Sequence, residues 1–355
     1  MKNKILKTVY AALFLAAFAF PGVMSLVQKK ETVGNEAKAE LKELNYLNFA
    51  EKFDAYFAES FGLRNSFVNL NNRLKYALFN ESGEKSVIAG RDGWLFYESA
   101  LHDFNGEDML SDEEINAIAD MLRDTQDYVT RSGAEFVFAI APNKMEIYGE
   151  NMPYYCVEST DAGNYERLME ALDERGVNHT DLKSVLREAK EGSDTLLYHK
   201  LDSHWNSLGA YTAYASIMEH TGFEAADYSQ TAYSVQDIFD GDLYGMLFPK
   251  GDKKDGQIVF DTEERFYYTS NFRGADDLLI STANDGGRGS LLMFRDSFGN
   301  ALYPFAANDF ERARFSRALP YDLTDAGAYD LVIIEIVERN IGNLLEYPPV
   351  LEAAE

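Results

Sequence analysis

Cysteine is nearly absent from this chain of 355 residues, which has only Cys156. A single thiol excludes an intramolecular disulfide framework and any paired-cysteine metal site, and it is compatible with either side of a membrane. Proline is also scarce, with eight in the chain, so few breaks interrupt the periodic segments. Because 46% of the residues are hydrophobic and 14% are aromatic, the composition predicts a folded chain with a substantial core and excludes a disordered one.

Basic residues are few relative to acidic ones. The chain has 33 lysines and arginines against 59 aspartates and glutamates, which gives a net charge of −26. A surface this negative repels phosphate polyanions, so we expect no nucleic-acid partner.

Long hydrophobic runs are absent except near the amino terminus. An uncharged run of nineteen residues, 9–27, follows Lys2, Lys4 and Lys7, and as a helix it would be about 28 Å long, close to the thickness of a bilayer core. We therefore expect residues 1–30 to form a single-pass signal anchor with the rest of the chain outside the cytoplasm. A cleaved signal peptide is the alternative, because 17–19 read Ala-Phe-Ala, a small-x-small site. Either way, residues 31–355 are exported.

Residues 31–84 are predicted to form a helical stalk or packing arm. Their apolar residues recur at roughly helical spacing with charged residues between them: Leu41, Leu44, Leu47, Phe53, Tyr56 and Phe57.

Residues 85–355 have the pattern of one α/β domain. Within 87–97, two short strands flank an Arg-Asp-Gly turn, and Ser111 with Glu114 forms a capping box that opens a helix to about 131. Further strands are expected at 135–141, 195–198, 290–294 and 331–337, and helices at 162–175, 207–220 and just after 297. Short apolar strands separated by helices predict a parallel sheet with helices on both faces. Residues 223–288 are less regular and are expected to be an insertion.

Polar residues follow four of these predicted strands. The strands lead into Pro142-Asn143-Lys144, Asp202-Ser203-His204-Trp205, Arg295-Asp296-Ser297-Phe298-Gly299 and Glu338-Arg339. Because reactive groups in open parallel sheets gather beyond the carboxyl ends of the strands, we expect these residues to meet there.

Ser297 is the candidate nucleophile. A serine between a buried strand and a helix exposes its hydroxyl, and the first helical amides point towards an oxyanion beside it. The alternative is a plain helix cap. A serine nucleophile needs a base held by a carboxylate, and His204 with Asp202 supplies that pair two residues apart, on one side of an extended segment.

Metal and cofactor sites are not expected. His199, Asp202 and His204 cluster in sequence, but one strand cannot direct all three inward, so we predict neither a metal nor another cofactor.

Several neighbours are candidates for contact with a substrate or an oxyanion, each with a structural alternative. Asn143 and Lys144 would donate hydrogen bonds or form a capping turn. Trp205 would stack on a sugar or support His204. Arg339 would anchor Asp202 or a substrate carboxylate, or form a solvated pair with Glu338.

A family resemblance rests on several blocks between residues 85 and 340. The run from Asp202 to Tyr211, DSHWNSLGAY, with Arg295-Asp296-Ser297-Phe298 further on, resembles the DHHW-motif proteins and the related alginate O-acetyltransferase group. The stretch 90–97, GRDGWLFY, and residues 142–148 are similar to segments of the same group.

The resemblance implies an SGNH-hydrolase-like fold in which the Asp-x-His pair precedes the serine. It implies that Ser297 is the nucleophile, His204 the general base and Asp202 the orienting carboxylate. It also implies acetyl transfer to a cell-envelope polysaccharide at the extracytoplasmic face of the membrane, with an integral-membrane protein as acyl donor. A carbohydrate esterase, or an inactive glycan-binding or assembly component of polysaccharide export, are the alternatives.

Two positions depart from the family pattern. Ser203 stands where the motif has histidine, and its side chain is expected to point away from His204. Arg295 stands where the enzymes commonly have glycine, and it would narrow the oxyanion site or recognise an anionic substrate.

Overall fold

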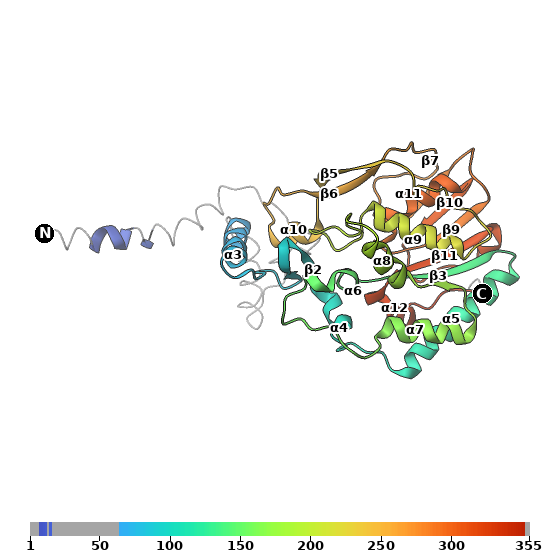
Figure 1. Cartoon of the computed structure of the whole chain (residues 1–355), viewed down its shortest axis with the longest axis horizontal. Helices are drawn as coiled ribbons and strands as arrows, with labels where there is room; N and C mark the ends of the chain where they lie inside the picture. Colours follow the sequence, from blue (N-terminus) through green and yellow to red (C-terminus); the bar gives the residue numbers. More distant parts are fainter. Residues whose placement is uncertain (1–6, 13, 16–63, 352–355) are drawn as a thin grey trace, which may run out of the picture. The chain divides into compact units, whose positions relative to one another are not determined.

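The computed structural model describes residues 7–12, 14–15 and 64–351, and Figure 1 labels their elements. The chain divides into two units: α3 (Arg64–Phe79) and residues 244–252 belong to one, and residues 85–243 and 253–351 to the other. Most of the predicted signal anchor and of the predicted arm lies outside the described residues. None of the helices described is both long and apolar enough to cross a membrane.

The larger unit contains most of the secondary structure. Its strands are β1 (Val87–Ala89), β2 (Leu95–Tyr97), β3 (Glu135–Ala141), β4 (His179–Thr180), β5 (Tyr233–Phe239), β6 (Asp255–Phe260), β7 (Tyr267–Tyr268), β8 (Leu279–Ala283), β9 (Ser290–Phe294), β10 (Arg312–Ser316) and β11 (Leu331–Val337). Its helices are α4 (Leu101–Phe104), α5 (Asp112–Arg131), α6 (Lys144–Tyr148), α7 (Asn164–Arg175), α8 (Leu182–Glu191), α9 (Ser207–Glu219), α11 (Gly299–Asp309) and α12 (Asn343–Glu346), and α10 (Asp242–Leu247) begins in it.

A seven-stranded sheet of order β4-β3-β11-β9-β10-β8-β7 forms the centre of this unit. The first five strands run parallel. β8 pairs antiparallel with β10, and β7 pairs antiparallel with β8. The sheet is therefore mixed, whereas the sequence predicted a parallel one.

Both faces of the sheet are covered by helices, as the sequence predicted (Figure 1). Successive side chains of a strand point to opposite faces. In β11, Ile333 joins the core cluster that includes residues of α8, α9 and α11, whereas Ile334 joins the cluster that includes residues of α5, α7 and α12. Because every residue of β11 is buried, the uninterrupted run LVIIEIV is what this central strand requires.

Several predicted elements are confirmed at or near their expected bounds. β3, β9 and β11 match the predicted ranges, α7 and α9 differ from theirs by one or two residues, and β1 and β2 form the expected hairpin. The capping box of Ser111 and Glu114 opens α5.

The strand expected at 195–198 is wrong. That segment is a loop, and its only ladder contact is an isolated bridge from Tyr198 to Trp205. The apolar residues there are buried because the loop packs onto the start of α9, where the Asn206 side chain accepts hydrogen bonds from the amides of Leu208 and Gly209. An apolar run of four residues does not distinguish a strand from such a buried loop.

The strand β10 was not expected, and the irregular segment 223–288 is more than an insertion. It supplies β7 and β8 to the central sheet, and it also forms the separate hairpin of β5 and β6.

Gly209 allows the loop that carries Asp202 and His204 to lie against α9. A Cβ atom at this position would lie 2.3 Å from the Leu197 carbonyl oxygen. Alanine normally stabilises a helix relative to glycine by about 1 kcal/mol, but the clash reverses the sign here. We expect Gly209→Ala to lower the free energy of unfolding by about 1–3 kcal/mol in urea titrations.

The matched control is Gly274→Ala, because a Cβ atom there meets nothing within 4 Å. A Gly209→Ala variant as stable as the parent protein would show that the loop does not depend on this close approach.

Candidate active site

Ser297, His204 and Asp202 meet at the carboxyl edge of the central sheet. Ser297 lies between the end of β9 and the start of α11, and the other two residues belong to the loop before α9. The Ser297 Oγ atom is 2.8 Å from His204 Nε2, and His204 Nδ1 is 2.7 Å from Asp202 Oδ1. With the imidazole proton on Nδ1, the ring donates to the carboxylate and accepts from the hydroxyl. This arrangement can activate the hydroxyl as a nucleophile.

The Asp202 carboxylate is buried and held from two directions. Its Oδ1 also accepts the backbone N–H of His204, and its Oδ2 accepts the backbone N–H of Asp242 at 2.7 Å. Burial alone would raise the pKa of Asp202, but the contacts with His204 and these amide donors hold it well below its usual range. Asp202 is therefore ionised when it faces the imidazole.

The environment of His204 favours the protonated ring. Burial lowers its pKa, but the hydrogen bond and charge of Asp202 and the charge of Asp242 outweigh that effect, so that the pKa is raised above 6.5. The charge of Arg339 acts in the opposite direction. An imidazole with raised proton affinity accepts a proton from serine more readily.

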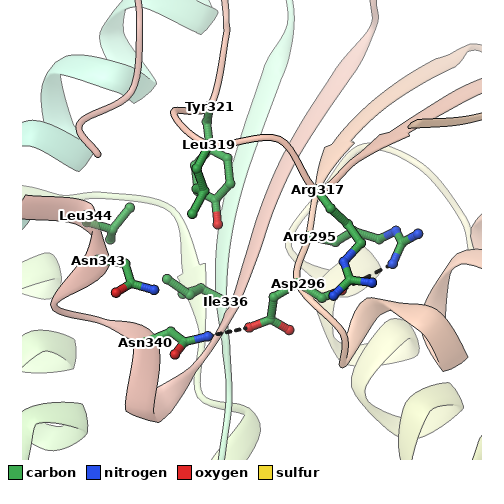
Figure 2. A pocket seen from close by; sticks show the side chains of 9 residues that line it. All are labelled: Arg295, Asp296, Arg317, Leu319, Tyr321, Ile336, Asn340, Asn343 and Leu344. Carbon is green, nitrogen blue, oxygen red and sulfur yellow. Dashed lines mark hydrogen bonds between the residues drawn. The ribbon is translucent and has the colours of Figure 1, made fainter. Parts of the chain in front are cut away.

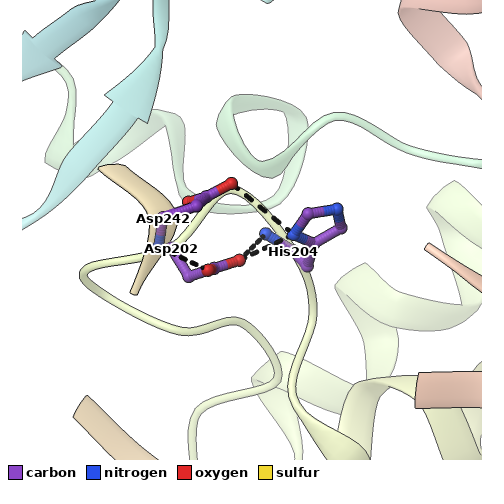
Figure 3. Close-up of side chains that lie close together, drawn as sticks. All are labelled: Asp202, His204 and Asp242. Carbon is purple, nitrogen blue, oxygen red and sulfur yellow. Dashed lines mark hydrogen bonds and ion pairs between the residues drawn. The ribbon is translucent and has the colours of Figure 1, made fainter. Parts of the chain in front are cut away.

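A second carboxylate, Asp242, lies behind His204 (Figure 3). Its Oδ2 is 3.8 Å from His204 Nδ1 and accepts the Ser203 hydroxyl at 2.6 Å, while its Oδ1 accepts the Ser203 amide. The Ser203 Oγ atom is itself 3.2 Å from His204 Nδ1. The expectation that residue 203 points away from His204 is therefore wrong, because the loop turns here and does not continue as a strand.

The sequence analysis did not identify Asp242. It lies in the irregular segment, 40 positions after Asp202, and no spacing rule connects the two. Its neighbour Gly241 is the available signal: a Cβ atom there would meet the Leu201 carbonyl oxygen at 2.3 Å, so glycine is needed for the two loops to touch.

Asp202, His204 and Asp242 also form the group whose ligand atoms lie close enough to hold a metal ion, all within 4.8 Å. The carboxylate oxygens of both aspartates already accept hydrogen bonds from the protein. His199, which the sequence grouped with Asp202 and His204, stacks on Phe239 and contacts the Gly256 carbonyl through Nδ1. The observed set thus differs from the one considered in the sequence, and its polar atoms are satisfied without an ion.

The backbone N–H of Ser297 is the available oxyanion donor. The next amide, of Phe298, donates to the Asp296 carboxylate at 2.8 Å, and the amide of Gly299 donates to Glu335. Within residues 64–351, the Ser297 amide has no acceptor. The expectation that several amides at the start of α11 face the oxyanion is therefore corrected to one.

Trp205 supports the nucleophile turn and does not face a sugar. The side chain is 1% exposed, and its indole N–H donates to the Phe298 carbonyl at 2.9 Å. The Phe298 ring in turn packs against the His204 ring, with centroids 4.8 Å apart. Because Trp205 is enclosed, the sugar-stacking alternative is wrong.

Lys144 is a buried positioning residue and not a substrate donor. Its ammonium donates to the carbonyl oxygens of Leu95, Lys200 and Asp202 at 2.5, 3.1 and 2.7 Å. Burial lowers the pKa of Lys144 to about 7, although the charge of Asp202 opposes that shift. One ammonium thus joins β2 to the loop that carries the candidate catalytic pair.

Asn143 and Arg339 act together. Asn143 is fully buried, and its side-chain oxygen accepts from Arg339 Nη1 at 3.0 Å. The Arg339 guanidinium lies over the rings of Tyr97 and Phe298. Glu338 forms its ion pair with Lys183, so the solvated Glu338–Arg339 pair is wrong, and no ion pair between Arg339 and Asp202 occurs in the described part of the chain.

Arg295 lies beneath the first turn of α11. It is 1% exposed and donates to the Ala275 and Asp296 carbonyls and to the Asn300 side chain. The guanidinium is thus committed to protein acceptors, and the narrowing of the oxyanion site expected from its size is replaced by packing under the helix.

Comparison with known proteins identifies the domain. Residues 87–257 match the family described as the SGNH hydrolase-like domain of acetyltransferase AlgX. This match includes Asp202, His204 and Asp242 and ends before Ser297.

Two curated relatives carry the description "Probable alginate O-acetylase AlgJ". The Pseudomonas aeruginosa protein is 29% identical over 183 residues, which cover 52% of this chain and 44% of that protein. The Pseudomonas putida protein is 24% identical over 251 residues, which cover 70% and 59%. The chain thus spans about half the length of the curated relatives it matches.

Solved structures show the same fold. A DHHW family protein from Eubacterium siraeum aligns with a TM-score of 0.52 and 16% identity, covering 72% of this chain and 94% of that one. Bacillus cereus PatB1, solved with a sulfonyl adduct, aligns with the same TM-score and identity, covering 72% and 95%. The fold and the family match define an SGNH hydrolase-like protein. Among these, the chain is a DHHW- and AlgJ-related member, as the sequence motifs predicted.

The role of Lys144 can be tested by removing its charge and keeping its length. Lys144→Met leaves three buried carbonyl oxygens without a donor, and each costs about 1–3 kcal/mol. We expect the free energy of unfolding to fall by about 3 kcal/mol or more in denaturant titrations. Lys200→Met is the control, since Lys200 lies over the same Trp94 ring. Equal effects in the two variants would contradict the positioning role.

The electrostatic role of Asp242 can be tested by NMR titration of the His204 ring. Asp242→Asn removes a negative charge that stabilises the imidazolium, while the charges of Asp202 and Arg339 remain, so we expect the pKa of His204 to fall. Asp240→Asn is the control, because Asp240 is exposed and pairs with Lys254. An unchanged or higher pKa in Asp242→Asn would refute the contribution of Asp242.

Proposed function

We propose that this protein is an O-acyltransferase that moves an acetyl group to a glycan through an acyl-serine on Ser297. The hydrogen-bonded sequence from Ser297 through His204 to Asp202 carries the proposal. The relatives described as alginate O-acetylases support the choice of acyl transfer to a polysaccharide. The particular glycan is left open, because only about half of those relatives is matched.

In the first half-reaction, the Ser297 oxygen attacks the carbonyl carbon of the acyl donor and its proton passes to His204 Nε2. The oxyanion that forms is stabilised by the Ser297 N–H, and the His204 imidazolium by Asp202. The leaving group departs with the proton from His204, and the acyl-serine remains.

In the second half-reaction, a sugar hydroxyl gives its proton to His204 and its oxygen attacks the acyl carbon. The Ser297 oxygen then leaves and recovers a proton from His204, which restores the starting state. If water replaces the sugar hydroxyl, the same steps give an esterase.

We place the domain outside the cytoplasm, anchored by residues 9–27. The partners are a cell-envelope polysaccharide and an integral-membrane protein that supplies the acyl group. The placement rests on the basic residues before that run and on the family resemblance.

The inactive alternative is disfavoured by one distance. A glycan-binding or assembly component has no need for a serine within hydrogen-bonding reach of a carboxylate-supported imidazole, but here the Oγ to Nε2 distance is 2.8 Å.

We expect Ser297→Ala and His204→Ala to lower turnover of a chromogenic acetyl ester by about 10³-fold or more, because each removes a member of one catalytic unit. Intact mass spectrometry of the full-length chain should show an acetyl adduct in the parent and none in Ser297→Ala.

Ser234→Ala and His102→Ala are the controls, since Ser234 is exposed on β5 and the His102 side chain is about half exposed. Turnover within tenfold of the parent in both active-site variants would end the proposed mechanism. Adding glycan acceptors then separates transfer from hydrolysis.

A further inference from the structure

A pocket of about 170 Å³ lies beside the residue that precedes Ser297 (Figure 2). It is lined by Arg295, Asp296, Arg317, Leu319, Tyr321, Ile336, Asn340, Asn343 and Leu344. Successive Cα atoms are 3.8 Å apart, so Asp296 places one wall of the pocket next to the candidate nucleophile. The volume suits one sugar ring or a group of similar size, since a liquid water occupies about 30 Å³.

The pocket and the base lie over opposite faces of the sheet. Tyr321, Ile336 and Leu344 belong to the core cluster that includes residues of α5, α7 and α12. Phe298, which contacts the His204 ring, belongs to the other cluster. A ligand in the pocket therefore approaches Ser297 from the side that His204 leaves open.

Polar groups in the pocket are without protein partners. Tyr321 is 2% exposed, yet no residue in the range 64–351 forms a hydrogen bond with its hydroxyl. Figure 2 shows that hydroxyl directed into the space between the lining residues. The Asn343 side chain is likewise without a partner in the same range. A buried hydroxyl without a protein partner is costly, and a ligand or water must satisfy it.

The charges around the pocket balance. Arg317 pairs with Asp276 at 2.6 Å, and the Asp296 carboxylate accepts the Val337 amide at 2.8 Å and the Asn340 side chain at 3.4 Å. With Arg295, this gives two positive and two negative groups. Because no cation is left without an opposing charge, an uncharged ligand fits better than a carboxylate-bearing one.

We propose that this pocket is a binding subsite for an uncharged sugar residue of the acceptor glycan. The Tyr321 hydroxyl, the Asn340 and Asn343 carboxamides and the Asp296 carboxylate supply the donors and acceptors that sugar hydroxyls use. Leu319, Ile336 and Leu344 supply apolar surface for the ring. The pocket anchors the glycan, while a hydroxyl of an adjacent sugar unit reaches His204. This assignment rests on the proposed function for the identity of the ligand as acceptor.

Ligand-observed NMR on the full-length chain tests the subsite with three probes: methyl β-D-glucoside, methyl N-acetyl-β-D-glucosaminide and methyl β-D-glucuronide. We expect at least one neutral glycoside to bind more tightly than the glucuronide. Tyr321→Phe removes one hydrogen bond, so we expect it to weaken that binding about two- to tenfold. Asn343→Ala should do the same.

Tyr329→Phe is the matched control, because Tyr329 packs against the same cluster and does not line the pocket. Tighter binding of the glucuronide, or no binding of a neutral glycoside, would overturn the assignment, and so would equal affinities in Tyr321→Phe and the parent. Formation of the acetyl adduct from a small ester is measured in the same variants and should not change. A parent that binds sugar and forms no adduct would refute the proposed function and leave the subsite standing.

Discussion

The carboxylate of Asp202 is the constraint on which the rest of the site depends. An ionised carboxylate in a buried loop is stable only if donors surround it. Here the donors are the His204 ring and amide and the Asp242 amide, while the Lys144 ammonium holds the Asp202 carbonyl. Two loops, the β1–β2 hairpin and the start of α6 are therefore fixed relative to one another by the need to satisfy one residue, and His204 is aimed at Ser297 as a result.

The sequence was sufficient for the parts of the fold that local patterns encode. The buried runs of β3, β9 and β11 and the capping box before α5 were read correctly, because periodicity and caps are short-range signals. The Asp202-x-His204 spacing and Ser297 identified three residues that the structure brings into contact. The loop at 195–198 was misread, because a short apolar run has the same composition whether it pairs or packs.

What the sequence could not give are long-range contacts. Nothing near Asp242 marks it as a neighbour of His204, since the contact exists only because Gly241 lets a distant loop approach Leu201. Lys144, Trp205 and Asn143 are polar residues at the right edge of the sheet, and the sequence placed them in the site. Their burial reverses the interpretation from ligand contact to support, and burial is a property of the folded chain.

The order of the strands has a consequence for how the chain is made. β11 lies between β3 and β9 at the centre of the sheet, although it follows both in the sequence. Until β11 emerges from the ribosome, β3 and β9 each present an unpaired apolar edge, which is a template for association with other chains. Export in an unfolded state, or chaperones that shield these edges, would therefore protect the protein during synthesis, and its folding is governed by contacts distant in sequence, which form slowly.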